Sequence, residues 1–332
     1  MKNKHIFLPI LISFIIFFSI NVLMVSSLAP QLLFKQLIAW GIGISLFFVG
    51  QQIIPRQLAN AKWFLFIGSC LLLLLPILMK NITRGSNRWL YIGTATIQPS
   101  EVVKPWLMIF LATSNLPFLH LIPTLIIALQ PDLGSAMSVF FLAIPVIFYN
   151  RNFLRASIAT MLVFLLFIPL IWRFGLRDYQ KHRIVTFLNP ASDPLNKGYN
   201  VIQSKIAIGS GGFWGKGYKK GTQGQLLFLP EKHTDFIFAA TAEELGFLGV
   251  IIILFAYYLL IHTLFTKAYQ TSDLPLFLFT LGFAFQIWIQ MFINIGMNIG
   301  LLPVTGIPLP FLSVGGSSII SYLLSLGIIF SH

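Results

Sequence analysis

Long runs of apolar residues constrain this sequence more than any other feature. The first, "IFLPILISFIIFFSINVLMV" at 6–25, is followed along the chain by further runs of similar length. A helix needs about 20 apolar residues to cross the hydrocarbon core of a bilayer. Hydrophobic residues make up 57% of the 332 residues and charged residues only 9%, which excludes an ordinary soluble domain. The sequence therefore predicts an all-α integral membrane protein, with residues 1–332 as a single membrane domain.

About ten of these runs qualify as transmembrane helices. They lie near 6–26, 33–53, 63–80, 99–113, 115–130, 133–150, 154–173, 235–263, 274–298 and 311–330. The first run has a basic start and small residues after it, as a signal peptide does. Its apolar stretch is too long for one, and further spans follow at once. We expect an uncleaved first span that starts in the cytoplasm, which places both termini there.

The distribution of Lys and Arg agrees with this orientation in most segments. Segments expected in the cytoplasm contain Lys2, Lys4, Arg56, Lys62, Arg151, Arg155 and Lys267. Two segments expected outside break the positive-inside rule. They are 80–98 and one long outer loop at about 174–234, where Lys and Arg outnumber Asp and Glu. An anionic partner outside the cytoplasmic face would explain the excess. A solvated loop beside acidic lipid headgroups would explain it equally well.

The second half of the long outer loop is rich in glycine, in the stretch "IGSGGFWGKGYKKGTQGQ" at 208–225. Its Gly215–Lys216 pair suggests a phosphate-binding loop. Ser210, however, stands where that motif needs its first glycine, and Gly217 stands where it needs Ser or Thr. No nucleotide cofactor is therefore implied. The glycines are expected to serve tight backbone turns at the membrane surface.

Cysteine and histidine usage gives no support to disulfide or metal chemistry. Cys70 is the one cysteine and lies inside an apolar run, so no disulfide framework is expected. The six histidines are scattered without ligand spacing, so a structural metal site is not expected either.

Charged residues in apolar surroundings are candidates for function, because burying a charge in a membrane is costly. Glu101 and Lys104 are three residues apart at the start of the fourth span and should meet on one helix face. They are either a mutually neutralising pair or a charged wall of a polar cavity. Asp132, beside a proline and a glycine, is a turn acid or a helix cap when taken alone.

Two further stretches carry polar or irregular sequence near the expected outer face. "RGSNRWLYIG" places Arg84 and Arg88 beside Trp89, which is expected to anchor at the membrane interface. Whether the two arginines bind phosphate stays open at this point. "NIGLLPVTGIPLPFLSVGGSS", at 298–318, is rich in Pro and Gly. Irregular backbone at membrane depth survives only where protein covers it or where it lines a wet cavity.

The stretch "LPEKHTDFIFAATAEELG" holds four of the nine acidic residues. Asp235 stands where the outer loop becomes a span. It is either an N-cap, whose carboxylate accepts from free backbone amides, or a general base at the edge of a membrane cavity. Glu243 and Glu244 lie one to two turns further along the span and are expected to be structural partners of buried donors.

Four blocks of the sequence resemble the signature blocks of the SEDS family (shape, elongation, division and sporulation proteins). They are "NRWLYIGTATIQPSEVVK", "LQPDLGSA", "GSGGFWGKGYKKGTQGQLLFLPEKHTDFIFAATAEELGFLG" and "LLPVTGIPLPFLSVGGSS", in the family's order. The third block resembles the elongation branch of the family more than it resembles the division branch. One departure is "GSNRW" at 85–89, where the family often has G-A-R-R-W, so one expected cation is missing.

The resemblance implies a peptidoglycan glycosyltransferase of a bacterial cytoplasmic membrane. The family polymerises lipid II, a disaccharide-pentapeptide on undecaprenyl pyrophosphate, outside that membrane during cell elongation and shape maintenance. Its essential acid, in the H-T-D-F block, is Asp235 here, and its Q-P-S-E-x-x-K block makes Glu101 and Lys104 shape the cavity. The remaining expected cavity and substrate-binding residues are Arg84, Arg88, Asp132, Lys216, Lys219, Lys220 and His233.

The resemblance also implies partners: a class B penicillin-binding protein, the elongation machinery and membrane lipids, but no nucleic acid. A divalent cation could accompany the pyrophosphate, although the sequence shows no dedicated ligand set. Two alternatives stay open. The chain could be a lipid II flippase, since intramembrane charges and broken helices suit transport, or a non-enzymatic activator of a penicillin-binding protein. A flippase should need polar groups along the whole path, whereas the cytoplasmic half looks apolar.

Overall fold

The computed structural model describes residues 4–79, 88–93, 95–150, 155, 158 and 197–331. Within them, five helices are long and apolar enough to cross a membrane. They are α1 (Lys4–Leu28), α2 (Pro30–Gly50), α3 (Lys62–Met79), α13 (Ile237–Gln270) and α14 (Leu274–Asn298). A short 3-10 helix, η1 (Gln57–Ala61), leads into α3. The chain is an all-α integral membrane protein, as the sequence predicts.

The fourth to sixth expected spans are broken into short helices. They are α4 (Pro99–Val102), α5 (Lys104–Thr113), η2 (Pro117–His120), α6 (Leu121–Leu129), α7 (Leu133–Phe140), η3 (Phe141–Ala143) and α8 (Ile144–Tyr149). Proline stands in the first turn of several of them, as Pro105 does in α5. A proline amide cannot continue a preceding helix, but it is tolerated in a first turn. The seventh expected span, 154–173, lies almost wholly outside the described residues.

The remaining elements refine the sequence expectations. The last span is α15 (Gly316–Ile329), which begins later than the expected 311 because 311–315 is irregular. A two-stranded antiparallel hairpin, β1 (Leu90–Ile92) and β2 (Ala95–Ile97), was not expected. Helices also occur in the long outer loop, for which the sequence predicts tight turns. Its described part, 197–234, contains α11 (Lys197–Ser210) and α12 (Thr222–Gln225).

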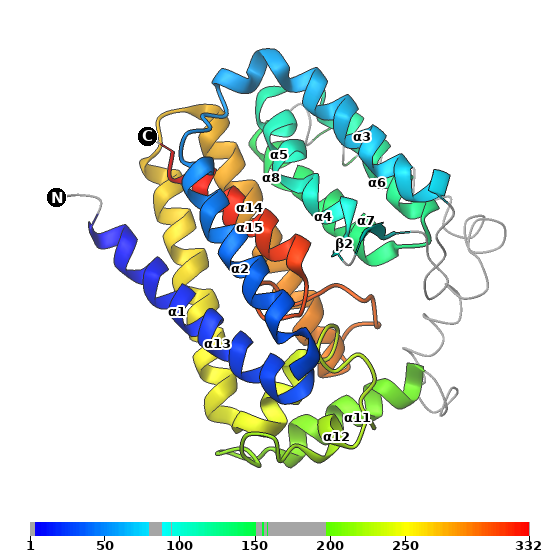
Figure 1. Ribbon diagram of the computed structural model, residues 1–332. Coiled ribbons are helices and arrows are strands. Elements are labelled where there is room, and N and C mark those ends of the chain that lie inside the picture. Colours follow the sequence, from blue (N-terminus) through cyan, green and yellow to red (C-terminus); the bar gives the residue numbers. More distant parts are fainter. Residues whose placement is uncertain are drawn as a thin grey trace.

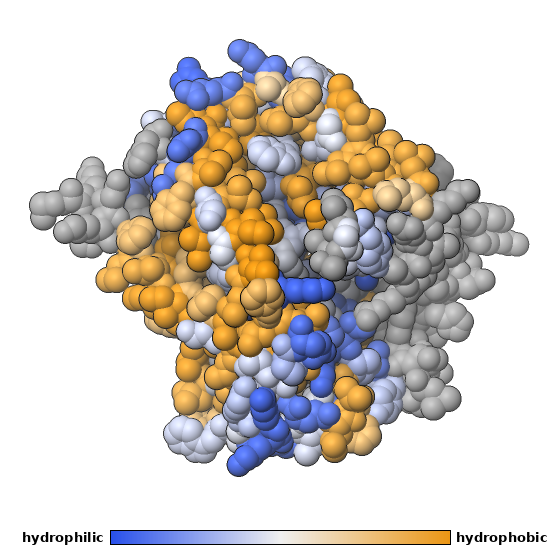
Figure 2. All heavy atoms as spheres, viewed as in Figure 1, coloured by the Kyte–Doolittle hydropathy of each residue, from blue (hydrophilic) through white to orange (hydrophobic). Residues whose placement is uncertain are grey.

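The long helices pack in two groups that α14 joins. α2 lies along α15, α1 along α13, and α13 along α14. α3, α5 and α6 form the second group, in which α5 packs on α14 (Figure 1). α2 and α15 approach closely, because a Cβ on Gly327 would lie 2.1 Å from the carbonyl oxygen of Phe47. Apolar side chains cover much of the visible bundle surface (Figure 2), as on helices that face lipid.

α11 and α12 lie together at one end of the bundle, beside the end of α1 and the start of α13 (Figure 1). Polar residues gather at the same end in the space-filling view (Figure 2). This end carries the described part of the long loop that the sequence assigns to the outside of the membrane.

α13 is interrupted at Gly246, where φ is 68° and ψ is −166°. The glycine-rich loop replaces the helical hydrogen bonds that the break removes. The Lys216 and Gly217 amides donate to the carbonyls of Glu243 (2.9 Å) and Glu244 (3.0 Å). In return, the amides of residues 247 and 248 donate to the carbonyls of residues 212 and 213, at 2.9 and 3.2 Å. The broken helix is therefore covered by protein, as irregular backbone at membrane depth must be.

Candidate functional site

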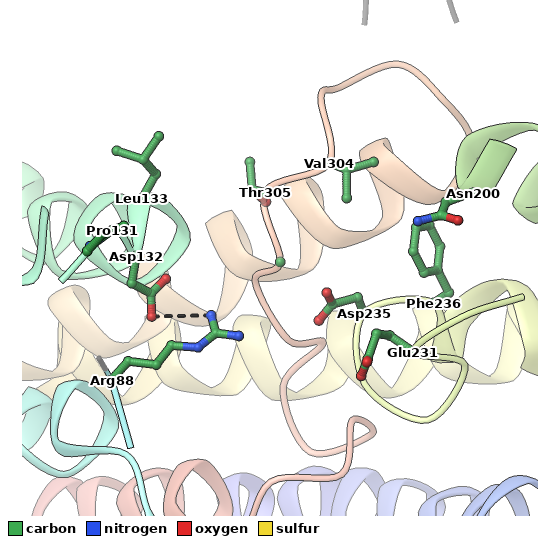
Figure 3. A pocket seen from close by; sticks show the side chains of 11 residues that line it. Arg88, Pro131, Asp132, Leu133, Asn200, Glu231, Asp235, Phe236, Val304 and Thr305 are labelled. Carbon is green, nitrogen blue, oxygen red and sulfur yellow. Dashed lines mark ion pairs between the residues drawn. The ribbon is translucent and has the colours of Figure 1, made fainter. Parts of the chain in front are cut away.

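A cavity of about 190 Å³ opens between the start of α7, α11 and the turn before α13. Five separate parts of the chain meet there: the segment before the β1–β2 hairpin, the start of α7, α11, the turn before α13, and the irregular segment after α14 (Figure 3). The lining residues are Arg88, Pro131, Asp132, Leu133, Asn200, Glu231, Asp235, Phe236, Val304, Thr305 and Gly306. Arg88, Asp132 and Asp235, all candidates from the sequence, are thus brought together by the fold.

Asp235 projects into this cavity from the turn that leads into α13. Its carboxylate points across the cavity toward the side occupied by Arg88 and Asp132 (Figure 3). α13 begins at Ile237, and Phe236, not Asp235, occupies its N-cap position. The amide of Ala239, in the first turn, donates to Oδ1 of Asn298 at 3.2 Å. A side chain from another helix therefore satisfies this first-turn donor.

Backbone hydrogen bonds hold the turn around Asp235 from two sides. The His233 carbonyl accepts from the Val314 amide at 2.9 Å, and the Thr234 carbonyl accepts from Oγ of Ser313 at 2.6 Å. Both donors belong to the irregular segment between α14 and α15. This segment therefore braces the H-T-D-F block along its backbone. His233 itself is not among the residues that line the cavity.

Arg88 and Asp132 form the opposite wall as an ion pair, with 3.4 Å between a guanidinium nitrogen and Oδ2. Asp132 is also the N-cap of α7. Its Oδ1 accepts from the amide of Ser135 at 3.1 Å, and its Oδ2 accepts from Oγ of the same residue at 2.8 Å. The side chain of Gln98 donates to Oδ2 at 3.4 Å. Asp132 is therefore a helix cap that also fixes the position of Arg88.

Glu101 and Lys104 contact each other, with 2.5 Å between Oε1 and Nζ. Their relative exposures are only 2% and 0%. They lie on the short helices α4 and α5 and do not line the cavity around Asp235. The pair is mutually neutralising, and the second carboxylate oxygen, Oε2, has no hydrogen-bond partner among the described residues.

Glu243 accepts hydrogen bonds from the glycine-rich loop and fixes it to α13. Its Oε1 accepts from Nζ of Lys216 at 2.7 Å, from Oγ1 of Thr222 at 3.0 Å and from the amide of Gln223 at 2.9 Å. Its Oε2 accepts from the amide of Gly224 at 3.2 Å. Lys216, one of the expected cavity and substrate-binding residues, is therefore engaged in a structural ion pair.

Glu244 makes a similar set of contacts toward α1. Its carboxylate accepts from Oγ of Ser27 at 2.7 and 2.8 Å, from the side chain of Gln225 at 3.0 Å and from the amide of Lys219 at 3.2 Å. Both glutamates are thus structural partners of buried donors, as expected. Nearby, burial lowers the pKa of Lys232, an effect that Glu244 partly opposes.

The other two loop lysines also lie away from the cavity lining. Nζ of Lys219 is 5.3 Å from the centroid of the Tyr218 ring, a cation–π distance, and Lys220 is exposed. Arg84 falls outside the described residues. Among the described residues, no group of three or more His, Cys, Asp or Glu side chains could hold a metal ion.

Sequence reasoning missed two asparagines on α14 that contact the H-T-D-F turn. The carbonyl of Asp235 accepts from the side-chain amides of Asn294 and Asn298, both at 3.1 Å. A signal for them exists in the sequence, because Gln286, Gln290, Asn294 and Asn298 recur every fourth residue. That spacing puts polar side chains on one face of an otherwise apolar helix, and polar residues inside a span are costly enough to indicate a role.

Known proteins are similar to this chain in both sequence and fold. The sequence model of the FtsW/RodA/SpoVE family, described as cell cycle proteins, matches residues 3–331. The peptidoglycan glycosyltransferase MrdB of Escherichia coli K12 is 39% identical over 303 residues, which cover 87% of this chain and 82% of that protein.

Two solved structures are similar over nearly the whole chain. One is a chain from a study of how a peptidoglycan synthase complex coordinates polymerization and crosslinking. It has a TM-score of 0.82 and 34% identity, covering 97% of this chain and 95% of that one. The other is the rod shape determining protein RodA of Thermus thermophilus, with a TM-score of 0.69 and 29% identity over 97% and 94% of the two chains.

Proposed function

Because the chain belongs to the FtsW/RodA/SpoVE family of cell cycle proteins, we propose that it polymerises lipid II into peptidoglycan glycan strands during cell elongation. Its similarity to MrdB, which is named a peptidoglycan glycosyltransferase, supports the same activity for this chain. The elongation role is supported by the likeness to RodA, a rod shape determining protein. The substrate, lipid II, follows from the family resemblance of the four sequence blocks.

The observation that carries this proposal is the position of Asp235 in a cavity whose other wall carries Arg88 (Figure 3). Glycan transfer joins a sugar hydroxyl of the acceptor to the anomeric carbon of the donor. As that C–O bond forms, the hydroxyl proton must go to a base, and Asp235 is the carboxylate that we assign to receive it. The bond from the anomeric carbon to the pyrophosphate oxygen breaks in the same step.

The leaving group is a lipid pyrophosphate, so negative charge develops opposite the base. Arg88 is suitably placed to stabilise it. A guanidinium has five N–H donors, and the Arg88–Asp132 ion pair involves one guanidinium nitrogen. Asp132 therefore holds the cation in place while other N–H groups can reach a phosphate oxygen. Arg84 remains a second proposed cation, and Lys219 and Lys220 are proposed to attract the anionic lipid from a distance.

A divalent cation would fit this cavity as an ion that arrives with the pyrophosphate. Glu231 and Asp235 both line the cavity, and Mg²⁺ is commonly held by one or two carboxylates together with substrate phosphates. Such an ion would neutralise the leaving pyrophosphate. The roles proposed for Asp235 and Arg88 do not depend on this ion.

The proposed setting is a bacterial cytoplasmic membrane, with both termini in the cytoplasm and the cavity on the outer side. A class B penicillin-binding protein is the proposed partner, and the elongation machinery the proposed wider assembly. Support comes from the similar chain in a peptidoglycan synthase complex that couples polymerization to crosslinking. Membrane lipids surround the apolar helices.

Purified protein incubated with lipid II, alone and with a class B penicillin-binding protein, tests the function. We expect glycan chains separable by gel electrophoresis, with more product when the partner is present. A flippase would move lipid II across vesicle membranes and leave it unpolymerised. A mere activator would yield no glycan chains in any sample that lacks another polymerase. Either of those results would replace the proposed activity.

A further inference from the structure

One face of α14 carries four side-chain amides and ends at the turn that holds Asp235. Gln286, Gln290, Asn294 and Asn298 are all buried, with relative exposures of at most 1%. Gln290 contacts side chains of two other helices: it donates to Oγ of Ser138 at 2.7 Å and accepts from the hydroxyl of Tyr322 at 2.8 Å. The two asparagines, one and two turns further along, contact the residues around Asp235 instead.

Asn298 holds both ends of the first turn of α13. Its Nδ2 donates to the carbonyl of Asp235, and its Oδ1 accepts from the amide of Ala239, at 3.1 and 3.2 Å. α11 contacts the same residue, because Oγ of Ser204 donates to the backbone carbonyl of Asn298 at 2.7 Å and to its Oδ1 at 3.4 Å. One amide side chain therefore fixes where the helix starts and where the preceding residue lies.

Asn294 joins Asp235 to the opposite lining of the cavity. Its Nδ2 donates to the carbonyl of Asp235 at 3.1 Å and to that of Ile307 at 2.8 Å. Ile307 follows Gly306, which adopts a φ of 76°. A Cβ built on Gly306 would lie 3.5 Å from Oδ2 of Asp235. The Asn294 amide thus sets the spacing between the carboxylate and the irregular segment that faces it.

We propose that Asn294 and Asn298 are positioning residues that hold the Asp235 carboxylate in its reactive place. The inference rests on the proposed function of Asp235 and adds the groups through which the rigid helix α14 acts on it. A reactive group on a turn is placed less accurately than one on a helix, and a misplacement of about 1 Å can slow a reaction about 10²-fold. Two amides anchored in α14 restrict the turn in this way.

The experiment compares Asn298→Leu and Asn294→Leu with the wild-type protein in lipid II polymerisation, each with its class B penicillin-binding partner. Leucine keeps the branched arrangement of the side-chain heavy atoms, although it is larger, and removes the amide. We expect kcat to fall about 10- to 100-fold, while KM changes less than about threefold, because neither side chain lines the cavity. Gln286→Leu is the matched control. It removes a buried amide from the same helix, and that amide has no hydrogen-bond partner among the described residues. It should retain wild-type kcat.

A merely structural role would lower kcat and protein stability together, so thermal unfolding is measured in detergent for every variant. Asn294→Ser and Asn298→Ser, which are smaller and still polar, replace any leucine variant that fails to fold. Loss of kcat in folded protein supports the inference. If the folded variants at Asn294 and Asn298 keep wild-type kcat while Asp235→Asn is inactive, the positioning role is overturned and the proposed function stays intact.

A double-variant cycle shows whether the asparagines act through Asp235. If they do, Asn298→Leu should slow wild-type protein strongly but change the residual rate of Asp235→Asn by less than about twofold, because groups that act as a unit are non-additive. An equal fold-loss in both backgrounds would show an independent role and overturn the inference. Full activity of Asp235→Asn alone would instead overturn the assignment of the base.

Discussion

Nζ of Lys216 lies 2.7 Å from Oε1 of Glu243, and this contact joins the outer loop to the interrupted helix α13. The glutamate is fully buried, whereas a quarter of the lysine side chain is exposed. The carboxylate also accepts from Thr222 and from the amides of residues 223 and 224. The ion pair is therefore one part of a clamp that orders the loop ahead of the H-T-D-F block.

Lys216→Met should destabilise the protein rather than weaken substrate capture. Removing one charged donor from a buried carboxylate costs about 1–3 kcal/mol, so the midpoint of thermal unfolding in detergent should fall. Lys220→Met is the control, since its side chain is exposed. Its unfolding midpoint should stay unchanged, with a higher KM for lipid II that depends on salt concentration. An unchanged midpoint for Lys216→Met, with only KM raised, would contradict the clamp.

Gly215 should tolerate no side chain. Its φ is 80°, and a Cβ there would lie 2.2 Å from the carbonyl oxygen of Glu244. Gly215→Ala should therefore detach the loop from the break in α13 and lower stability by more than about 3 kcal/mol, through both strain and lost hydrogen bonds.

Gly209→Ala provides the comparison for Gly215→Ala. Gly209 lies within α11, and a Cβ built on it would meet nothing within 4 Å among the described residues outside its own helix backbone. Alanine there should stabilise the helix by about 0.5–1 kcal/mol. Thermal unfolding and limited proteolysis of the loop would report both changes. Similar unfolding midpoints for the two variants would show that close packing at residue 215 is unimportant.

The Glu101–Lys104 pair predicts a recovery experiment. Both side chains are buried and lie 2.5 Å apart, so removing either partner leaves an uncompensated charge that costs about 3–5 kcal/mol. Glu101→Gln and Lys104→Met should each reduce the yield of folded protein, and the double variant should recover much of it. Membrane-inserted protein is measured by fluorescence-detected gel filtration. Equal yields of all three variants would be incompatible with a buried pair.

The sequence predicts the long spans well because length and apolarity suffice for them. α14 occupies the expected residues 274–298, helped by two start signals: Asp273 caps the helix through the amide of Leu276, and proline stands in the first turn. The short helices between 99 and 149 are harder, because each proline can either kink a helix or start a new one. The hairpin at 90–97 is also hard to predict, because its strands have only three residues, too few to show a strand alternation.

The candidate site divides in the same way. Asp235 and Arg88 carry local signals, since each is a charge beside an apolar run. The break at Gly246 carries none, because "EELGFLGV" reads as continuous helix and a single glycine inside a helix is tolerated. Its left-handed backbone depends on partners about 30 residues earlier in the chain. The contacts of Asn294 and Asn298 with Asp235 likewise depend on α14 packing against the start of α13, which no local pattern specifies.

Asp235→Asn separates the role of a base from that of a structural carboxylate. Asparagine keeps the shape of aspartate, and at a helix start it caps about as well. The carbonyl of residue 235, which accepts from both asparagines of α14, is unaffected by the change. The variant should therefore fold and insert like the wild-type protein. It cannot accept a proton as a carboxylate does, so polymerisation of lipid II should fall about 10²- to 10⁴-fold.

Asp273→Asn is the matched control for this loss. Asp273 caps α14 with its carboxylate and lies outside the cavity lining, so asparagine should keep its cap and preserve activity within about twofold. Rates are compared at equal amounts of membrane-inserted protein, with a class B penicillin-binding protein present. Asp235→Asn leaves untouched the side of the cavity that we propose to bind pyrophosphate, so its KM for lipid II should change little while kcat falls. Substantial glycan synthesis by Asp235→Asn would show that another group accepts the proton.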